Sequence, residues 1–303
     1  KLSDFCARNV IGNMKERNDM TEMRNKVHKL FGDKAERVTT EEMRKVCEEI
    51  SYLLRYGLPS LRPTRSLPCK LDHGDIDLVY RSEPTLDVKK VLSSSLGFGF
   101  IEMKSNGDVI SVLYHSVDVG KTVHIDFIKA DDTTFTTKLQ YFSFNDFSGI
   151  FGMLSKKYHF KYGSEGFFKR YRDSRGNWHD ILVSRDLTVG MELLGYDPEL
   201  WLKMENYEDM IAFMLTSPMF DYRLFVHDSL NQSDKKSMKR PVVEYVVQKL
   251  RESGKTATIN DENHFFKDTT AHHFCEIQKM LIEDRITQRK LEREGRSTND
   301  SQG

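Results

Sequence analysis

Three aspartates occupy positions from which their carboxylates could bind metal ions. Asp75 and Asp77 lie two residues apart in DIDLVY, a segment with the alternation of a strand. Because side chains two apart in a strand project from the same face, the two acids lie side by side. Asp126 has the same kind of position between apolar residues of a second strand-like segment, 123–128. If the strands are neighbours, three like charges converge, an arrangement that is costly without a cation.

Mg²⁺ is the expected cation, because it is a hard ion that prefers oxygen ligands. Two such ions about 3.5–4 Å apart could bind the attacking and leaving oxygens of a phosphoryl transfer. The competing interpretation is that Asp75 and Asp77 are solvated acids on a half-exposed strand, and an isolated DxD favours it. The metal interpretation gains support from Gly74 directly before the pair, from a serine-containing loop upstream, and from the third acid downstream.

The sequence around these acids contains segments with helical residue spacing and segments with strand-like alternation. A capping box, TTEE at 39–42, precedes the helically spaced apolar residues Met43, Val46, Cys47, Ile50, Leu53 and Leu54. The remaining pattern predicts a proline-containing loop at 57–68, strands at 75–80, 98–103, 109–115 and 123–129, and a helix at 85–96. Beyond residue 141 it predicts helices and short turns to about 200, mostly helix to about 291, and a last dozen residues of disordered composition.

Composition limits the class of protein. The formal net charge is zero, so attraction to a polyanion would depend on local basic patches or bound metal. No apolar run approaches the roughly 20 residues of a membrane-spanning helix, and the first residues lack the features of a secretory signal. The four cysteines are far apart and form no CxxC pair, which favours a reducing, intracellular compartment, cytoplasmic or nuclear.

The acid motifs resemble those of the nucleotidyltransferases related to DNA polymerase β, in which a Gly-Ser loop precedes a DxD strand and a third Asp follows. HGDIDLVY and VHIDFI match the acid strands, and the stretch from TKLQYF to DPELW is similar to the link from palm to thumb in family X polymerases. The resemblance covers roughly residues 62–202. It implies an α+β fold whose nucleotidyltransferase palm has a mixed β-sheet. The domains would be a helical N-terminal unit (1–60), the palm (61–138), a thumb-like domain (139–203), and a helical C-terminal extension with a disordered tail (204–303).

The resemblance also implies roles for individual residues. Asp75 and Asp77 would bind two Mg²⁺ ions, with Mn²⁺ as an alternative. Asp126 would complete the coordination of the ion that activates the acceptor hydroxyl. Other residues would bind the nucleotide: Arg65, Ser66, Lys70, Gly74, Tyr141 and Phe142. The chain departs from the family where Arg65 replaces the glycine of the Gly-Ser loop, unless Gly57 and Ser60 fill that role in a longer loop. Residues 1–60 also lack a helix-hairpin-helix of the GxGxxTA type.

The expected reaction is transfer of a nucleoside monophosphate from an NTP or dNTP to a hydroxyl, with release of pyrophosphate. A nucleic-acid 3′ end is the expected acceptor, because residues 156–172 interleave lysines and arginines with aromatic rings. The alternatives are a template-independent terminal or tRNA-type transferase and a catalytically inactive scaffolding protein of the same fold. The identity of the acceptor (DNA, RNA, a protein side chain or a small molecule), oligomeric state, template dependence and sugar preference stay open.

Overall fold

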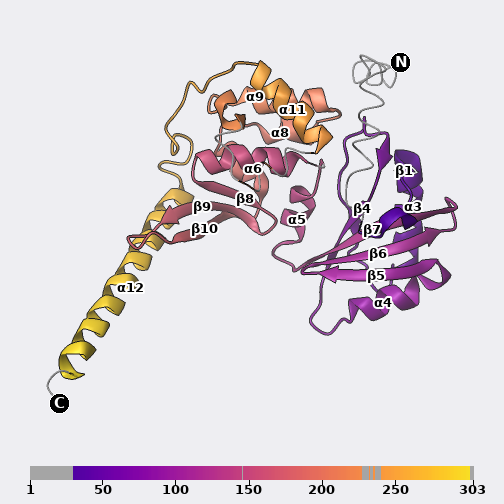
Figure 1. The fold of residues 1–303 in the computed structure, drawn as a ribbon, viewed down its shortest axis with the longest axis horizontal. Helices are drawn as coiled ribbons and strands as arrows, with labels where there is room; N and C mark the ends of the chain where they lie inside the picture. The colour runs from indigo at the N-terminus through magenta and orange to yellow at the C-terminus, as the bar shows by residue number, and fades with distance from the viewer. Residues whose placement is uncertain (1–29, 145, 227–231, 233–234, 236–239, 301–303) are drawn as a thin grey trace.

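The computed structural model describes residues 30–144, 146–226, 232, 235 and 240–300. Expectations for residues 1–29 and 301–303, including a helical start to the chain, lie outside the described residues. The fold is α+β, and two large hydrophobic cores organise it. One core lies within residues 38–127, and the other takes most of its residues from 144–275. Figure 1 shows the corresponding two lobes, each built around its own sheet.

The first lobe is a five-stranded mixed sheet with helices packed on it. Its strands follow the order β2-β4-β7-β6-β5, in which β4 and β7 are parallel and the other pairs are antiparallel. A small antiparallel pair, β1 and β3, lies beside the sheet. The elements are η1 (Gly32–Lys34), β1 (Val38–Thr39), α3 (Thr40–Leu53), β2 (Arg62–Pro63), β3 (Asp72–His73), β4 (Ile76–Arg81), α4 (Val88–Ser95), η2 (Gly97–Gly99), β5 (Phe100–Asn106), β6 (Val109–Ser116) and β7 (Lys121–Ala130).

Helix α3 forms where the sequence predicts it. Thr39 is the N-cap and exchanges hydrogen bonds with Glu42, which confirms the capping box. Val46, Cys47 and Ile50 are buried against the sheet. This helical segment therefore shares the core of the first sheet.

The second lobe contains a three-stranded antiparallel sheet and several helices. Its elements are α5 (Phe135–Tyr141), α6 (Phe147–Lys157), β8 (Phe160–Gly163), β9 (Gly166–Arg172), β10 (Trp178–Ser184), α7 (Leu187–Glu192), α8 (Pro198–Leu202), α9 (Tyr207–Thr216), η3 (Tyr222–Phe225), α11 (Pro241–Glu252) and α12 (Thr270–Asp300). The sheet corrects the expectation of helices and short turns between 141 and 200. Strands form where Phe160, Lys161 and Tyr162 alternate ring and cation before the tight turn at Gly163–Gly166, and where the aromatic-rich residues 167–172 pair with them after it.

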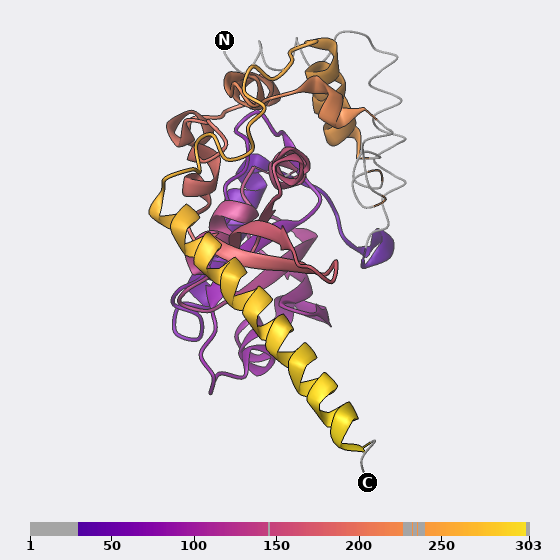
Figure 2. The same cartoon turned by 90° about the vertical axis from the view of Figure 1, so that its left-hand side faces the viewer.

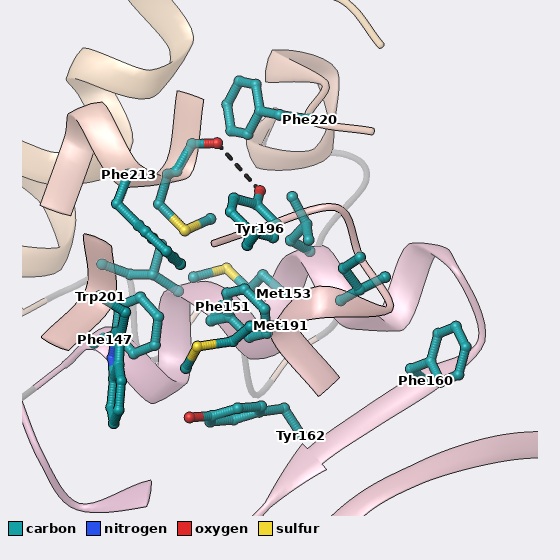
Figure 3. Packing of buried hydrophobic residues seen from close by; sticks show 14 of the residues in the cluster. Phe147, Phe151, Met153, Phe160, Tyr162, Met191, Tyr196, Trp201, Phe213 and Phe220 are labelled. Atoms are coloured by element: carbon teal, nitrogen blue, oxygen red, sulfur yellow. Dashed lines mark hydrogen bonds between the residues drawn. The ribbon is translucent and has the colours of Figure 1, made fainter. Parts of the chain in front are cut away.

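Aromatic rings fill the core of the second lobe. Phe147 and Phe151 of α6 pack together, and Phe151 meets the ring of Tyr162 from β8 edge-on. Phe213 of α9 stacks on Tyr196, so helices and sheet contribute to one cluster (Figure 3). The segments predicted as thumb and C-terminal extension therefore share this core.

Helix α12 is the last described element. It begins on the second lobe and projects past it (Figure 2). The helix continues to Asp300, through residues for which composition predicts disorder. Adding one residue to an existing helix forms a hydrogen bond without a new nucleation cost, which favours this continuation. Within the described residues, no helix combines the length and apolarity that crossing a membrane requires.

Candidate active site

The register of β4 and β7 brings the predicted acids together. The strands run parallel, and Asp77 lies directly opposite Asp126. Asp75 precedes β4 by one residue, on the same side as Asp77. The intervening positions are apolar and buried, as Ile76 opposite Ile125 illustrates. The expectation that the two acid strands are neighbours is thus confirmed.

Asp126 is held in place by two polar neighbours. Ser111 of β6, its cross-strand partner, donates a hydrogen bond of 2.5 Å from Oγ to Asp126 Oδ1. His124 Nε2 lies 2.8 Å from the same oxygen, and Phe31 meets the imidazole edge-on. In the described part of the chain, both of these contacts are made to Oδ1 of Asp126. They fix the rotation of the carboxylate and leave Oδ2 for a further ligand.

The electrostatics of the site disfavour three ionised carboxylates. Burial raises the pKa of Asp77 to about 8, and the charges of Asp75 and Asp126 act in the same direction. The charges of Lys70 and His124 oppose this rise. Although burial by itself lowers the pKa of His124, its hydrogen bond to Asp126 and the neighbouring negative charges raise it overall.

This set of groups fits a hard divalent cation. Carboxylate oxygens are the ligands that Mg²⁺ prefers, and a cation removes the mutual repulsion that raises the pKa of Asp77. As the side chains stand, no three carboxylate, imidazole or thiol groups in the described part of the chain are close enough to form a complete ion site. The backbone nevertheless sets Asp77 and Asp126 opposite each other on adjacent strands.

Lys70 is the predicted nucleotide-binding residue whose charge acts on these acids. Burial lowers the pKa of Lys70, while the negative charges of Asp75, Asp77 and Asp146 act to raise it. Asp146 comes from the second lobe, where it is the N-cap residue of α6. Its Oδ1 accepts a hydrogen bond of 2.5 Å from Arg240 Nη1.

Gly74 permits a close approach between the acid strand and the segment before α3. A Cβ added at Gly74 would lie 2.7 Å from Nη1 of Arg37. Arg37 in turn pairs with Asp72. The glycine predicted to help bind the nucleotide thus lies against a guanidinium group, which can bind phosphate oxygens.

Arg65 and Ser66 lie where the two lobes meet. Arg65 Nη2 donates a hydrogen bond of 2.8 Å to the carbonyl of Leu202, and its guanidinium lies 5.0 Å from the centre of the Phe144 ring. Ser66 follows it and is half-buried. The charge that replaces the expected glycine is therefore engaged in contacts between the lobes.

Tyr141 and Phe142 end helix α5 and pack into cores. The ring of Tyr141 lies 5.8 Å from that of Tyr162, and Phe142 packs against a small cluster that includes Val79 and Ile128. These two strand residues follow the acids Asp77 and Asp126 by two positions. Phe142 therefore supports the strands that carry the site, while Tyr141 packs on the core of the second lobe.

Part of the basic, aromatic segment 156–172 is buried. Phe160 and Phe167 are fully buried, so they have no free face on which a base could stack. Lys169 is also buried and lies 3.3 Å from Glu262. Lys161 and Arg170 both pair with one carboxylate. The rings of Phe160 and Phe167 and the ammonium of Lys169 point inward, while Lys161 and Arg170 lie on the outer side of the sheet.

Sequence reasoning did not identify four residues of this region. Ser111, His124, Asp146 and Arg240 carry no motif of their own. Only His124 left a signal, because it lies two positions before Asp126 and therefore on the same face. No family model matches this chain, and no curated protein is significantly similar to it in sequence.

Proposed function

We propose that the chain is a metal-dependent nucleotidyltransferase that transfers a nucleoside monophosphate from an NTP or dNTP to a hydroxyl. The observation that carries the proposal is the register of β4 and β7, which sets Asp77 opposite Asp126 with Asp75 beside them. Three carboxylates at adjacent strand positions impose a large electrostatic cost, and a bound cation offsets it.

In this proposal Asp75 and Asp77 would bind both Mg²⁺ ions, and Asp126 would complete the coordination of the ion that activates the acceptor hydroxyl. Bound there, the ions would supply charge to the attacking and leaving oxygens of a phosphoryl transfer. Asp126 accepts the proton of the acceptor hydroxyl. Its contacts with Ser111 and His124 hold Oδ1 in place and thereby orient Oδ2.

The nucleotide would bind with its triphosphate toward the cationic side of the site. Lys70 and Arg240 both interact with Asp146, and Arg37 lies beside Gly74. Lysine binds phosphate as a point charge and arginine can bind it through two hydrogen bonds. Lys70 is the strongest candidate, because Asp75 and Asp77 both act on its charge.

A nucleic-acid 3′ end is the acceptor that we propose, on the basis of the family resemblance. Segment 156–172 does not contribute to this choice, because four of its six rings are buried: Tyr158, Phe160, Tyr162 and Phe167. The second candidate is an inactive scaffolding protein of the same fold. The position of Arg65 favours it, since a guanidinium stands where a glycine would approach the phosphates and is engaged with Leu202.

One assay distinguishes the proposed polymerase-like transferase from the terminal transferase and the inactive scaffolding protein. The purified chain is incubated with Mg²⁺, each labelled NTP and dNTP, and a panel of DNA and RNA primers, with and without template. We expect labelled primer from the parent, none from Asp75→Asn or Asp126→Asn, and parental activity from Asp118→Asn, an exposed acid at the turn before β7. Label on RNA ends without template would identify a terminal transferase.

Nucleotide binding without transfer would support the scaffolding candidate. Equilibrium dialysis of the same labelled nucleotides measures this binding directly. Equal transfer by the parent and by both aspartate variants would overturn the assignment of the acids.

A further inference from the structure

The loop at residues 64–71 joins β2 to β3 and leads into the acid strand β4. Its start is attached to that strand, because the amide of Thr64 donates a hydrogen bond of 3.0 Å to the carbonyl of Asp77. Its end is attached to helix α3, because the hydroxyl of Thr40 donates a hydrogen bond to the carbonyl of Lys70. Both ends of the loop therefore belong to the lobe that carries the three acids.

The middle of the same loop belongs to the second lobe. Leu67 is 1% exposed and lies in the aromatic core of that lobe. On one side of it, the amide of Phe144 donates a hydrogen bond of 2.7 Å to the carbonyl of Arg65. On the other side, the amide of Cys69 donates a hydrogen bond of 3.0 Å to the carbonyl of Glu205. The loop thus crosses to the second lobe and returns.

A tight turn connects Leu67 to Lys70. The amide of Lys70 donates a hydrogen bond of 3.0 Å to the carbonyl of Leu67, and Pro68 occupies the second position of this turn. Proline fixes its own φ angle near the value that this position requires, so the turn has little freedom to change shape. The place of Leu67 in the core therefore determines the place of the Lys70 backbone.

The ammonium group of Lys70 is directed to the acid site. Lys70 is half-buried, and the negative charges of Asp75 and Asp77 act to raise its pKa, so these carboxylates lie within electrostatic reach. Among the residues that the structure describes, its ammonium has no hydrogen-bond or ion-pair partner. A partly desolvated cation without such a partner favours an anionic ligand.

We propose that Leu67 is a positioning residue for the nucleotide, through which the core of the second lobe places the Lys70 ammonium beside the acids. The inference rests on the proposed binding of nucleotide by Lys70 and extends it, because the second lobe becomes part of the nucleotide site. Leu67 itself contacts no ligand. It holds the turn, and the turn holds the lysine in a position from which it can meet the triphosphate without being ordered on binding.

Equilibrium dialysis of labelled nucleotides in Mg²⁺ measures the effect of Leu67. Leu67→Ala should raise the nucleotide dissociation constant about tenfold, because the turn and its lysine must then be ordered when the nucleotide binds. Leu67→Met keeps the apolar volume and should restore binding to within about twofold of the parent. The matched control is Leu250→Ala, which removes an equally buried leucine of the same core from α11 and should leave nucleotide binding unchanged. Circular dichroism shows whether each variant is folded.

Two comparisons distinguish positioning from a general loss of structure. The affinity of Leu67→Ala for Mn²⁺, measured by electron paramagnetic resonance, should equal that of the parent, since strand register holds Asp77 and Asp126 together. In a Lys70→Gln chain, adding Leu67→Ala should cause no further loss of nucleotide affinity, because the lysine through which Leu67 acts is absent.

Amide hydrogen exchange of the parent is a measurement that needs no variant. Bound nucleotide should slow exchange at the amides of Cys69 and Lys70. It should also slow exchange at the amide of Phe144, which belongs to the second lobe and is bonded to the loop. A decrease of at least about threefold at all three amides is expected, because the ligand stabilises the closed form of every segment attached to the lysine.

Nucleotide binding by Leu67→Ala equal to that of the parent would overturn this inference and leave the proposed function in place. So would equal weakening by Leu250→Ala, or a further loss of similar size in the Lys70→Gln chain. If Leu67→Ala is unfolded, the exchange experiment decides, and slowing confined to the first lobe overturns the inference. A parent chain that binds no nucleotide would overturn the proposed function and this inference together.

Discussion

Replacing Asp77 with asparagine should stabilise the metal-free protein. The pKa of Asp77 rises from 3.8 to about 8 on folding, because the carboxylate is buried beside Asp75 and Asp126. An acid whose pKa is raised on folding costs stability as pH rises from its unfolded pKa to its folded pKa. Between about pH 4 and pH 8 the parent should therefore lose stability progressively, and Asp77→Asn should lose less.

The magnitude follows from the shift. Each unit of pKa difference corresponds to about 1.4 kcal/mol, so at pH 7 the full effect has an upper bound of about 4 kcal/mol. Asp75 is exposed and can turn toward solvent, which reduces the repulsion that the asparagine removes. We expect Asp77→Asn to raise the free energy of unfolding by about 2–4 kcal/mol at pH 7.

Urea unfolding in EDTA at pH 4, 5.5, 7 and 8.5 measures this difference. The gain of Asp77→Asn over the parent should be near zero at pH 4 and should grow until about pH 8. Asp118→Asn is the control and should show no such trend. A variant less stable than the parent at pH 8.5, or a gain independent of pH, would refute the electrostatic account of the site. Added Mg²⁺ should stabilise the parent more than Asp77→Asn.

Three further predictions concern the surroundings of the site and the fold. Ser111→Ala or His124→Leu should lower the affinity for Mn²⁺ about tenfold, because each variant removes a hydrogen bond that orients Asp126. Titration followed by electron paramagnetic resonance measures this affinity, and an unchanged affinity would contradict the positioning role. Lys169→Met should change the free energy of unfolding by less than about 1 kcal/mol, since Glu262 is exposed enough to stay solvated. A decrease in the free energy of unfolding of more than about 3 kcal/mol, measured by urea unfolding, would show that the Lys169–Glu262 ion pair is needed for stability. Thr39→Ala should cost about 1 kcal/mol in the same assay, because it removes the cap of α3, and no loss would mean that the cap is dispensable.

The first lobe could be predicted from local pattern. The alternation in DIDLVY and VHIDFI identified the acid strands, and the TTEE box identified the start of α3. Gly107, at φ 58°, forms the turn between β5 and β6, since glycine adopts that conformation without steric cost. These signals are short in range, so one sequence suffices to detect them.

The second lobe was harder to predict because its signals are ambiguous. Residues 160–172 alternate rings and cations, a pattern that suits both a nucleic-acid surface and a strand with one buried face. Only packing decides between them, and Phe160 and Phe167 pack inward. Residues such as Arg240 and Asp146 meet across 94 positions of sequence, and periodicity carries no information about such contacts.

The parallel pairing of β4 and β7 also has a consequence for how the protein folds. Asp77 and Asp126 are 49 positions apart, whereas β6 and β7 follow one another across a short turn. Closing a long loop costs more chain entropy than closing a short one, so local hairpins form early and the β4–β7 ladder forms late. The carboxylates therefore converge only when the sheet is nearly complete. In the proposed enzyme, metal affinity would therefore appear only after β4 has paired with β7.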